Sequence, residues 1–172
     1  MKHIINRYEQ NYGPEEHKDY LTTGSTPIQQ EFFSILTCDC PVALTEFKCI
    51  ESHDLNFPQQ NFAFSISASR AIEAVEFEVI SFDAFNRVLD ISLVSQHINM
   101  KSGQSVNFSV PAPTAESTDK ATAYVAYVGR VRLDNAEIWS VDTRSLYQPI
   151  VDAGFSPSTR QPSGPHDETP AL

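Results

Sequence analysis

The stretch from residue 71 to residue 93, AIEAVEFEVISFDAFNRVLDISL, constrains the fold of this chain more than any other. Its first half alternates apolar with acidic side chains, in the order Val75, Glu76, Phe77, Glu78 and Val79. A period of two puts alternate side chains on opposite faces, so this segment predicts a β-strand with one buried face and one acidic, solvated face. The apolar pair Val79-Ile80 interrupts the alternation and predicts a β-bulge, which moves the following side chains to the other face.

The second half predicts the return strand of a hairpin. Residues 83–87, DAFNR, contain Asp and Asn, which tolerate turn conformations and bond to their own main chain. The alternation then resumes, and we expect Leu89, Ile91 and Leu93 to face the core.

Further strands are predicted on both sides of the hairpin. The candidate segments are residues 31–37, 42–51, 61–69, 104–110, 121–133 and 137–141. In the longest of them one face is expected to carry Ala123, Val125, Tyr127, Gly129, Val131 and Leu133. No convincing long helix separates these segments. The predicted fold class is therefore all-β: an antiparallel two-sheet immunoglobulin-like β-sandwich of about seven or eight strands, with a closed barrel as the alternative.

The two ends of the chain differ in composition from its middle. Residues 1–29 are polar and aperiodic, which predicts a flexible N-terminal arm. Residues 30–148 make up the predicted sandwich domain. Residues 149–172 are rich in Pro and Ser and predict a disordered tail.

The charge balance disfavours two classes of partner. The chain has 12 Lys and Arg against 22 Asp and Glu, a net charge of −10. Binding to nucleic acid or to an anionic membrane depends on basic residues, so we expect neither. No apolar run approaches the length of a transmembrane helix, the N-terminus lacks a secretory signal pattern, and three cysteines are an odd number for a disulfide framework. These features predict a cytoplasmic protein.

Four residues have side chains that bind zinc at plausible spacing: Cys38, Cys40, Cys49 and His53. A tetrahedral zinc site needs four such ligands. However, Cys49 is in phase with Phe47 on a predicted strand, as a buried thiol would be, and structural zinc sites usually space paired cysteines more widely. We therefore predict no metal and no cofactor, and keep a small-ligand or metal-binding module in the Cys38–His53 region as the alternative.

No motif for catalysis is present, whether a nucleophile elbow, a zinc-protease helix or a phosphate-binding loop. We predict no catalytic residues and no enzymatic activity. Three aromatic residues are candidates for a protein-binding patch: Tyr124, Tyr127 and Trp139. Arg130 and Arg132 are expected to pair across strands with the acidic face of Glu76 and Glu78.

Three short segments resemble the bacterial FxLYD-type domains, which are small immunoglobulin-like sandwiches. Phe82-Asp83 matches the aromatic-Asp pair that ends a strand in that family. Ser102-Gly103-Gln104 matches a later turn, with Ser and Gln in place of the family's Pro and Glu, and Ala123-Tyr124-Val125 resembles the strand that follows. The resemblance covers about residues 42–133 and implies the sandwich fold and an accessory role.

The sequence thus predicts a non-enzymatic β-sandwich that acts through protein–protein contact or self-assembly. Exposed strand edges are ready templates for a partner strand, so the predicted partner is another protein or a second copy of the chain, as in a homo-oligomer.

Overall fold

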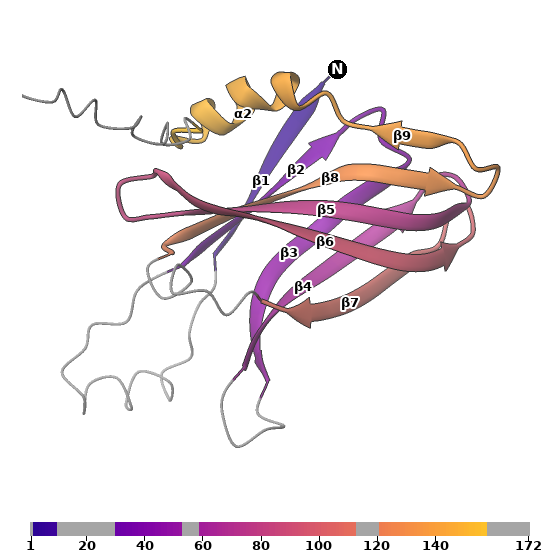
Figure 1. The fold of residues 1–172 in the computed structure, drawn as a ribbon, viewed down its shortest axis with the longest axis horizontal. Coiled ribbons are helices and arrows are strands. Elements are labelled where there is room, and N and C mark those ends of the chain that lie inside the picture. The colour runs from indigo at the N-terminus through magenta and orange to yellow at the C-terminus, as the bar shows by residue number, and fades with distance from the viewer. Residues whose placement is uncertain (1, 10–29, 53–58, 113–120, 158–172) are drawn as a thin grey trace, which may run out of the picture.

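The computed structural model describes residues 2–9, 30–52, 59–112 and 121–157. Nine strands in these ranges form two sheets (Figure 1). The six-stranded sheet contains, in spatial order, β1 (His3–Glu9), β2 (Glu31–Thr37), β8 (Ala123–Leu133), β5 (Ile72–Phe82) and β6 (Val88–Met100), with β9 (Ile138–Ser140) beside β8. The three-stranded sheet contains, in spatial order, β3 (Val42–Ser52), β4 (Gln59–Ala68) and β7 (Ser105–Pro111).

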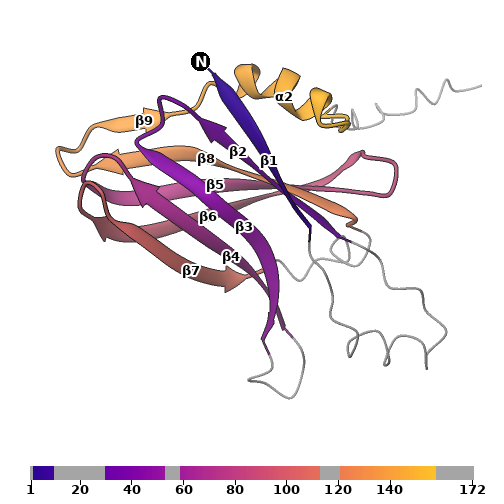
Figure 2. The ribbon, with the colours of Figure 1, turned by 180° about the vertical axis from the view of Figure 1, so that it is seen from behind.

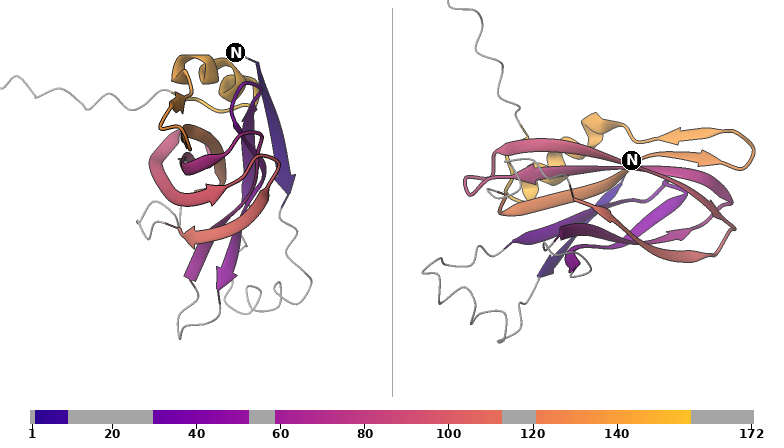
Figure 3. Two further views of the ribbon diagram at one scale, coloured as in Figure 1. Left: turned by 90° about the vertical axis from the view of Figure 1, so that its right-hand side faces the viewer. Right: turned by 60° about the horizontal axis from the view of Figure 1, so that its bottom comes forward.

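The two sheets lie face to face as layers (Figures 2 and 3), and aromatic side chains fill the space between them. Phe64 of the three-stranded sheet contacts Phe77 of the other sheet, with ring centroids 4.8 Å apart. Phe62 contacts Tyr124 across the same space, edge to face, with ring centroids 5.4 Å apart. Each sheet buries one apolar face against the other, which confirms the prediction of an all-β, two-sheet fold and not a closed barrel.

A second apolar core lies on the outer face of the six-stranded sheet. The short helices η2 (Thr143–Leu146) and α2 (Tyr147–Asp152) cover one end of that face (Figure 1). Phe155, just beyond α2, is buried against Phe33 and Phe82, at centroid distances of 5.1 and 4.4 Å. The predicted disordered tail is therefore wrong for residues 149–157, because these apolar side chains have a sheet face to cover. Residues 158–172 lie outside the described residues.

This second core explains the apolar pair that suggested a bulge in β5. Val79 belongs to the core between the sheets, whereas Ile80 belongs to the core under α2. The pairing of β5 with β6 continues without a shift through both residues, so the predicted bulge is not there. A strand that is covered on both faces reads as a continuous apolar run.

A bulge does occur in the neighbouring strand β8. Glu76 of β5 pairs with Arg130, but the next residue, Phe77, pairs with Val128, which leaves Gly129 as the extra residue. The predicted single face of β8 is consequently split at Gly129. One group of its side chains lies under α2, namely Ala123, Val125 and Tyr127, and another lies between the sheets, namely Val131 and Leu133.

Strand β1 corrects the prediction of a flexible arm. Residues 3–9 pair antiparallel with β2, and the imidazole of His3 lies between two hydroxyls, 3.1 Å from Thr37 Oγ1 and 2.8 Å from Ser145 Oγ. The remainder of the predicted arm, residues 10–29, lies outside the described residues. Strand β2 in turn pairs in parallel with β8, so the six-stranded sheet is mixed and not purely antiparallel as predicted.

The turn between β5 and β6 forms as its sequence predicts. Asp83 accepts hydrogen bonds from the backbone N–H groups of Phe85 and Arg87, at 2.8 and 3.0 Å, and Asn86 adopts a left-handed conformation with φ of 58°. The Arg87 N–H, as the largest cause, lowers the pKa of the Asp83 carboxyl. No helix within the described ranges is long and apolar enough to cross a membrane.

Candidate interaction surface

The predicted cysteine cluster is distributed between a turn and a core strand. Cys38 is exposed, Cys40 is half-buried against the core, and Cys49 is buried on β3. Burial raises the pKa of the Cys40 thiol to about 12, which disfavours the thiolate that metals and electrophiles require. His53 lies outside the described residues. Where the structure describes the chain, no three His, Cys, Asp or Glu side chains come together as a metal site.

The predicted aromatic patch does not form a surface. Tyr124 is 1% exposed and lies in the core between the sheets, whereas Tyr127 is 4% exposed and lies in the core under α2. Trp139 is half-buried against the first core. Because Tyr124 and Tyr127 lie on opposite sides of the bulge-bearing strand β8, no single partner can contact both. The three side chains therefore do not share one exposed surface.

Tyr127 instead holds an acidic side chain on the outer face of the sheet. Its hydroxyl donates a hydrogen bond to Glu78 Oε2 at 2.5 Å. Burial first, and then the bond and the charge of Glu78, raise the pKa of Tyr127. The carboxylate lies over the bulge, where a Cβ on Gly129 would be 3.2 Å from Glu78 Oε1. The glycine thus leaves room for this pair.

Beyond α2, the outer face carries pairs of opposite charge. Arg130 Nε is 3.7 Å from Glu76 Oε1, which confirms the predicted cross-strand pairing for these two residues. Arg132 pairs with Glu73 at 2.8 Å, and not with Glu76 or Glu78. A shallow hollow of about 390 Å³ lies here, lined also by Ser95, His97 and Ile138. Because its two arginines are already paired with carboxylates, the hollow presents balanced charge and no selective site for one ion.

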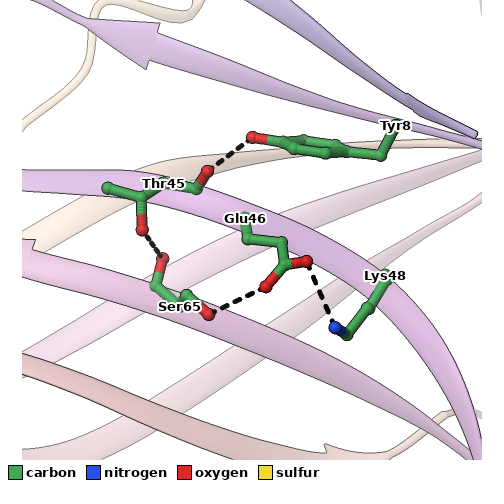
Figure 4. A network of polar contacts seen from close by, with 5 residues as sticks. All are labelled: Tyr8, Thr45, Glu46, Lys48 and Ser65. Atoms are coloured by element: carbon green, nitrogen blue, oxygen red, sulfur yellow. Dashed lines mark hydrogen bonds and ion pairs between the residues drawn. The ribbon is translucent and has the colours of Figure 1, made fainter.

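Strand edges differ strongly in how well they are protected against another strand. One side of the sandwich ends in β1 and β3, and Figure 4 shows how that side is closed: Tyr8 Oη donates to the backbone oxygen of Thr45 at 2.6 Å. At Thr45 the pairing of β3 with β4 shifts register, and Lys48 forms an ion pair with Glu46 at 3.1 Å, next to a hydrogen bond from Ser65. Bulges and charges are the usual means of blocking strand addition.

The opposite side of the sandwich, formed by β6 and β7 and called the β6/β7 side below, has register shifts near the two ends of β6 but almost no charge. Asp, Glu, Lys and Arg make up 20% of the chain, yet within β6 and β7 they are represented by Asp90 alone. Both strands end their sheets in the described part of the chain. Phe77, paired with Val94 of β6, contacts Phe108 of β7 at 5.8 Å, so the two edges lie on one side.

Two apolar side chains of β6 point away from the core. Leu93 is 64% exposed and Ile91 is 46% exposed on the outer face, beside Glu78 and Ile80 of β5. The prediction that Leu89, Ile91 and Leu93 face the core is wrong for Ile91 and Leu93, because the pairing Phe77–Val94 puts the even-numbered residues of this segment inward. The sequence contained the signal: Val94, Ile98 and Met100 extend an inward alternation over the second half of β6.

Comparison with known proteins assigns no family. No family model and no curated protein matches the chain. A crystal structure of a hypothetical protein from Peptoclostridium difficile 630 is similar, with a TM-score of 0.49 and 10% sequence identity, over 68% of this chain and 92% of that one. At these values the similarity assigns neither a family nor a function to this chain.

Proposed function

We propose that the protein is a non-enzymatic β-sandwich that acts through protein–protein contact on the β6/β7 side. The observation that carries the proposal is the length and composition of the β6 edge: 13 residues that contain no Lys, Arg or Pro. Edge strands of this kind are templates for a partner strand, and depletion of charge marks the core of protein interfaces.

We include in the proposal an immunoglobulin-like arrangement of the two sheets, restricted to which strands are neighbours and not to the direction of the chain. If the strands are taken in reverse chain order, from β9 back to β3, each has the same neighbours as in a constant-type immunoglobulin sandwich. The order β9-β8-β5-β6 then corresponds to strands A-B-E-D, and the order β3-β4-β7 corresponds to strands G-F-C. This supports a Greek-key sandwich with immunoglobulin-like layers and the opposite chain direction. The resemblance to FxLYD-type domains stays a prediction for residues 42–133.

We also propose a reducing compartment, the cytoplasm, as the site of action. Cys38 and Cys40 are free thiols, and Cys38 is exposed at the surface. Free exposed thiols persist where glutathione and thioredoxin keep them reduced.

The contact function is tested by site-specific photo-crosslinking in the cells that make the protein. A photoreactive amino acid replaces Leu93 on the β6 edge in one variant and Ile50 on the opposite, β3 edge in the other; both native side chains are exposed. We expect covalent adducts from position 93 and few from position 50. Equal yields at the two positions, or no adduct from position 93, would contradict a functional β6/β7 side.

A further inference from the structure

We infer that β6 pairs antiparallel with β6 of a second copy of the chain, about a two-fold axis that passes at Leu93. This inference rests on the proposed contact function and names its partner. It would join the six-stranded sheets of two copies into one continuous sheet, with the same patch used by both copies, as in most symmetric dimers.

The backbone of β6 is regular where the axis is placed. From Asp90 to His97 each residue pairs one-to-one with β5, from Ser81 to Ala74, without a register shift. The irregular positions lie outside this segment, between Ser81 and Phe82 at one end and between Ile72 and Ala74 at the other. A segment without bulges presents the N–H and C=O groups of its outer edge in the regular pattern that an antiparallel partner requires.

Charge favours a second copy on this side over any other side. Two copies that each carry a net charge of −10 repel one another, so they can approach closely only where few charges face each other. The β6/β7 side has one carboxylate, that of Asp90. An acidic or basic foreign partner, by contrast, would find almost no charge there to select it.

The position of the axis follows from the side chains of β6. With the axis at Leu93, Asp90 of one copy lies opposite Gln96 of the other, whereas an axis at Asp90 would oppose two carboxylates, which is destabilising. Directly opposed residues in an antiparallel pair have Cβ atoms about 4.5–5.5 Å apart. The two Leu93 side chains would therefore contact each other, with each Ile91 as a diagonal neighbour, and part of the exposed apolar surface of β6 would be covered.

The first experiment measures the mass of the intact chain in solution by light scattering, at concentrations from about 10 μM to about 1 mM, where interfaces of small area assemble. We expect a monomer–dimer equilibrium that shifts towards dimer as salt screens the net charge. Leu93→Lys should weaken dimerisation at least tenfold, because it places two like charges opposite each other. Ile138→Lys is the matched control, since Ile138 is 66% exposed on the same outer face but lies on β9, and it should leave the dimer unchanged.

The second experiment tests the register with Leu93→Cys in a Cys38→Ser background. Opposed thiols with Cβ atoms at the near end of this range, about 4.5 Å apart, form a disulfide on mild oxidation, and a short thiol-specific crosslinker joins thiols at the far end. We expect a covalent dimer for Leu93→Cys and none for Ile138→Cys. A monomer at all concentrations, a dimer indifferent to Leu93→Lys, or a dimer in which Leu93→Cys forms neither the disulfide nor the crosslink would overturn the inference. If light scattering shows a monomer while position 93 still crosslinks to a different protein in cells, self-pairing is wrong and the contact function stands.

Discussion

The replacement of Phe155 by Ala tests whether the second core under α2 is a real part of the fold. Phe155 is 5% exposed, lies 4.4 Å from the Phe82 ring and 5.1 Å from the Phe33 ring, and comes from a segment that the sequence assigns to a tail. Full burial of a Phe side chain contributes about 1.5–3 kcal/mol, and its removal from a core costs about 3–5 kcal/mol with the cavity included. Because Phe155 lies near the end of the described chain, where the cavity that it leaves can partly collapse, we expect Phe155→Ala to lower the free energy of unfolding by about 3 kcal/mol.

Urea unfolding followed by the fluorescence of the single tryptophan, Trp139, measures this loss in the free energy of unfolding. The midpoint of thermal unfolding should fall by roughly 6–12 °C, since about 1 kcal/mol shifts a domain of this size by 2–4 °C. Val151→Ala is the control, because Val151 of α2 is 38% exposed and its truncation should cost less than about 0.5 kcal/mol. A loss below about 1 kcal/mol for Phe155→Ala would refute the reasoning, because Phe155 would then not be a core residue.

Three further outcomes follow from the outer face and the thiols. The raised pKa of Tyr127 means that the folded state keeps this phenol neutral. Its contribution to stability is therefore fully present below about pH 10, the pKa of an unperturbed tyrosine, and is lost as pH rises further. Absorbance titration should show one tyrosine that ionises after the others, and Tyr127→Phe should remove that late phase. Gly129→Ala should destabilise the fold by about 1 kcal/mol, because the new Cβ would crowd the carboxylate of Glu78 that Tyr127 holds in place. A double-mutant cycle with Tyr127→Phe should give a coupling energy of at least about 0.5 kcal/mol, and additive effects of the two substitutions would disprove this explanation. A thiol reagent near neutral pH should modify the exposed Cys38 much faster than Cys40, whose pKa is raised to about 12. Mass spectrometry of the Cys38→Ser variant should show that the fast phase is lost. Rapid labelling of Cys40 would contradict its burial.

Local patterns sufficed for the strands and for the main turn. The alternation around Phe77 predicted the strand β5 and its buried face, and Asp83 and Asn86 predicted the turn that follows it. These features depend on residues close together in the chain, since a period of two and the geometry of a turn are local properties. The pairing of Glu76 with Arg130 was also accessible, because the charges alternate on strands that must share a sheet.

The direction in which side chains face could not be read locally. A period-two pattern states which residues share a face but not which face is covered, and the sequence placed Ile91 and Leu93 inward although β5 pairs with β6 in the register that exposes them. The same limit applies to Val79 and Ile80: their adjacency predicts a bulge, whereas in the structure α2 covers the outer face and Ile80 packs beneath it.

The sequence by itself determined the all-β class, most strand positions and the low charge of β6. Tertiary structure alone decided which strands are edges, which edge Tyr8 closes, and that Phe155 has a sheet face to cover. The reason is physical: an edge is defined by the absence of a neighbour, and burial by contacts between segments far apart in the chain. The strand order therefore makes the β6/β7 side a candidate interaction surface, which the alternation within β6 alone does not indicate.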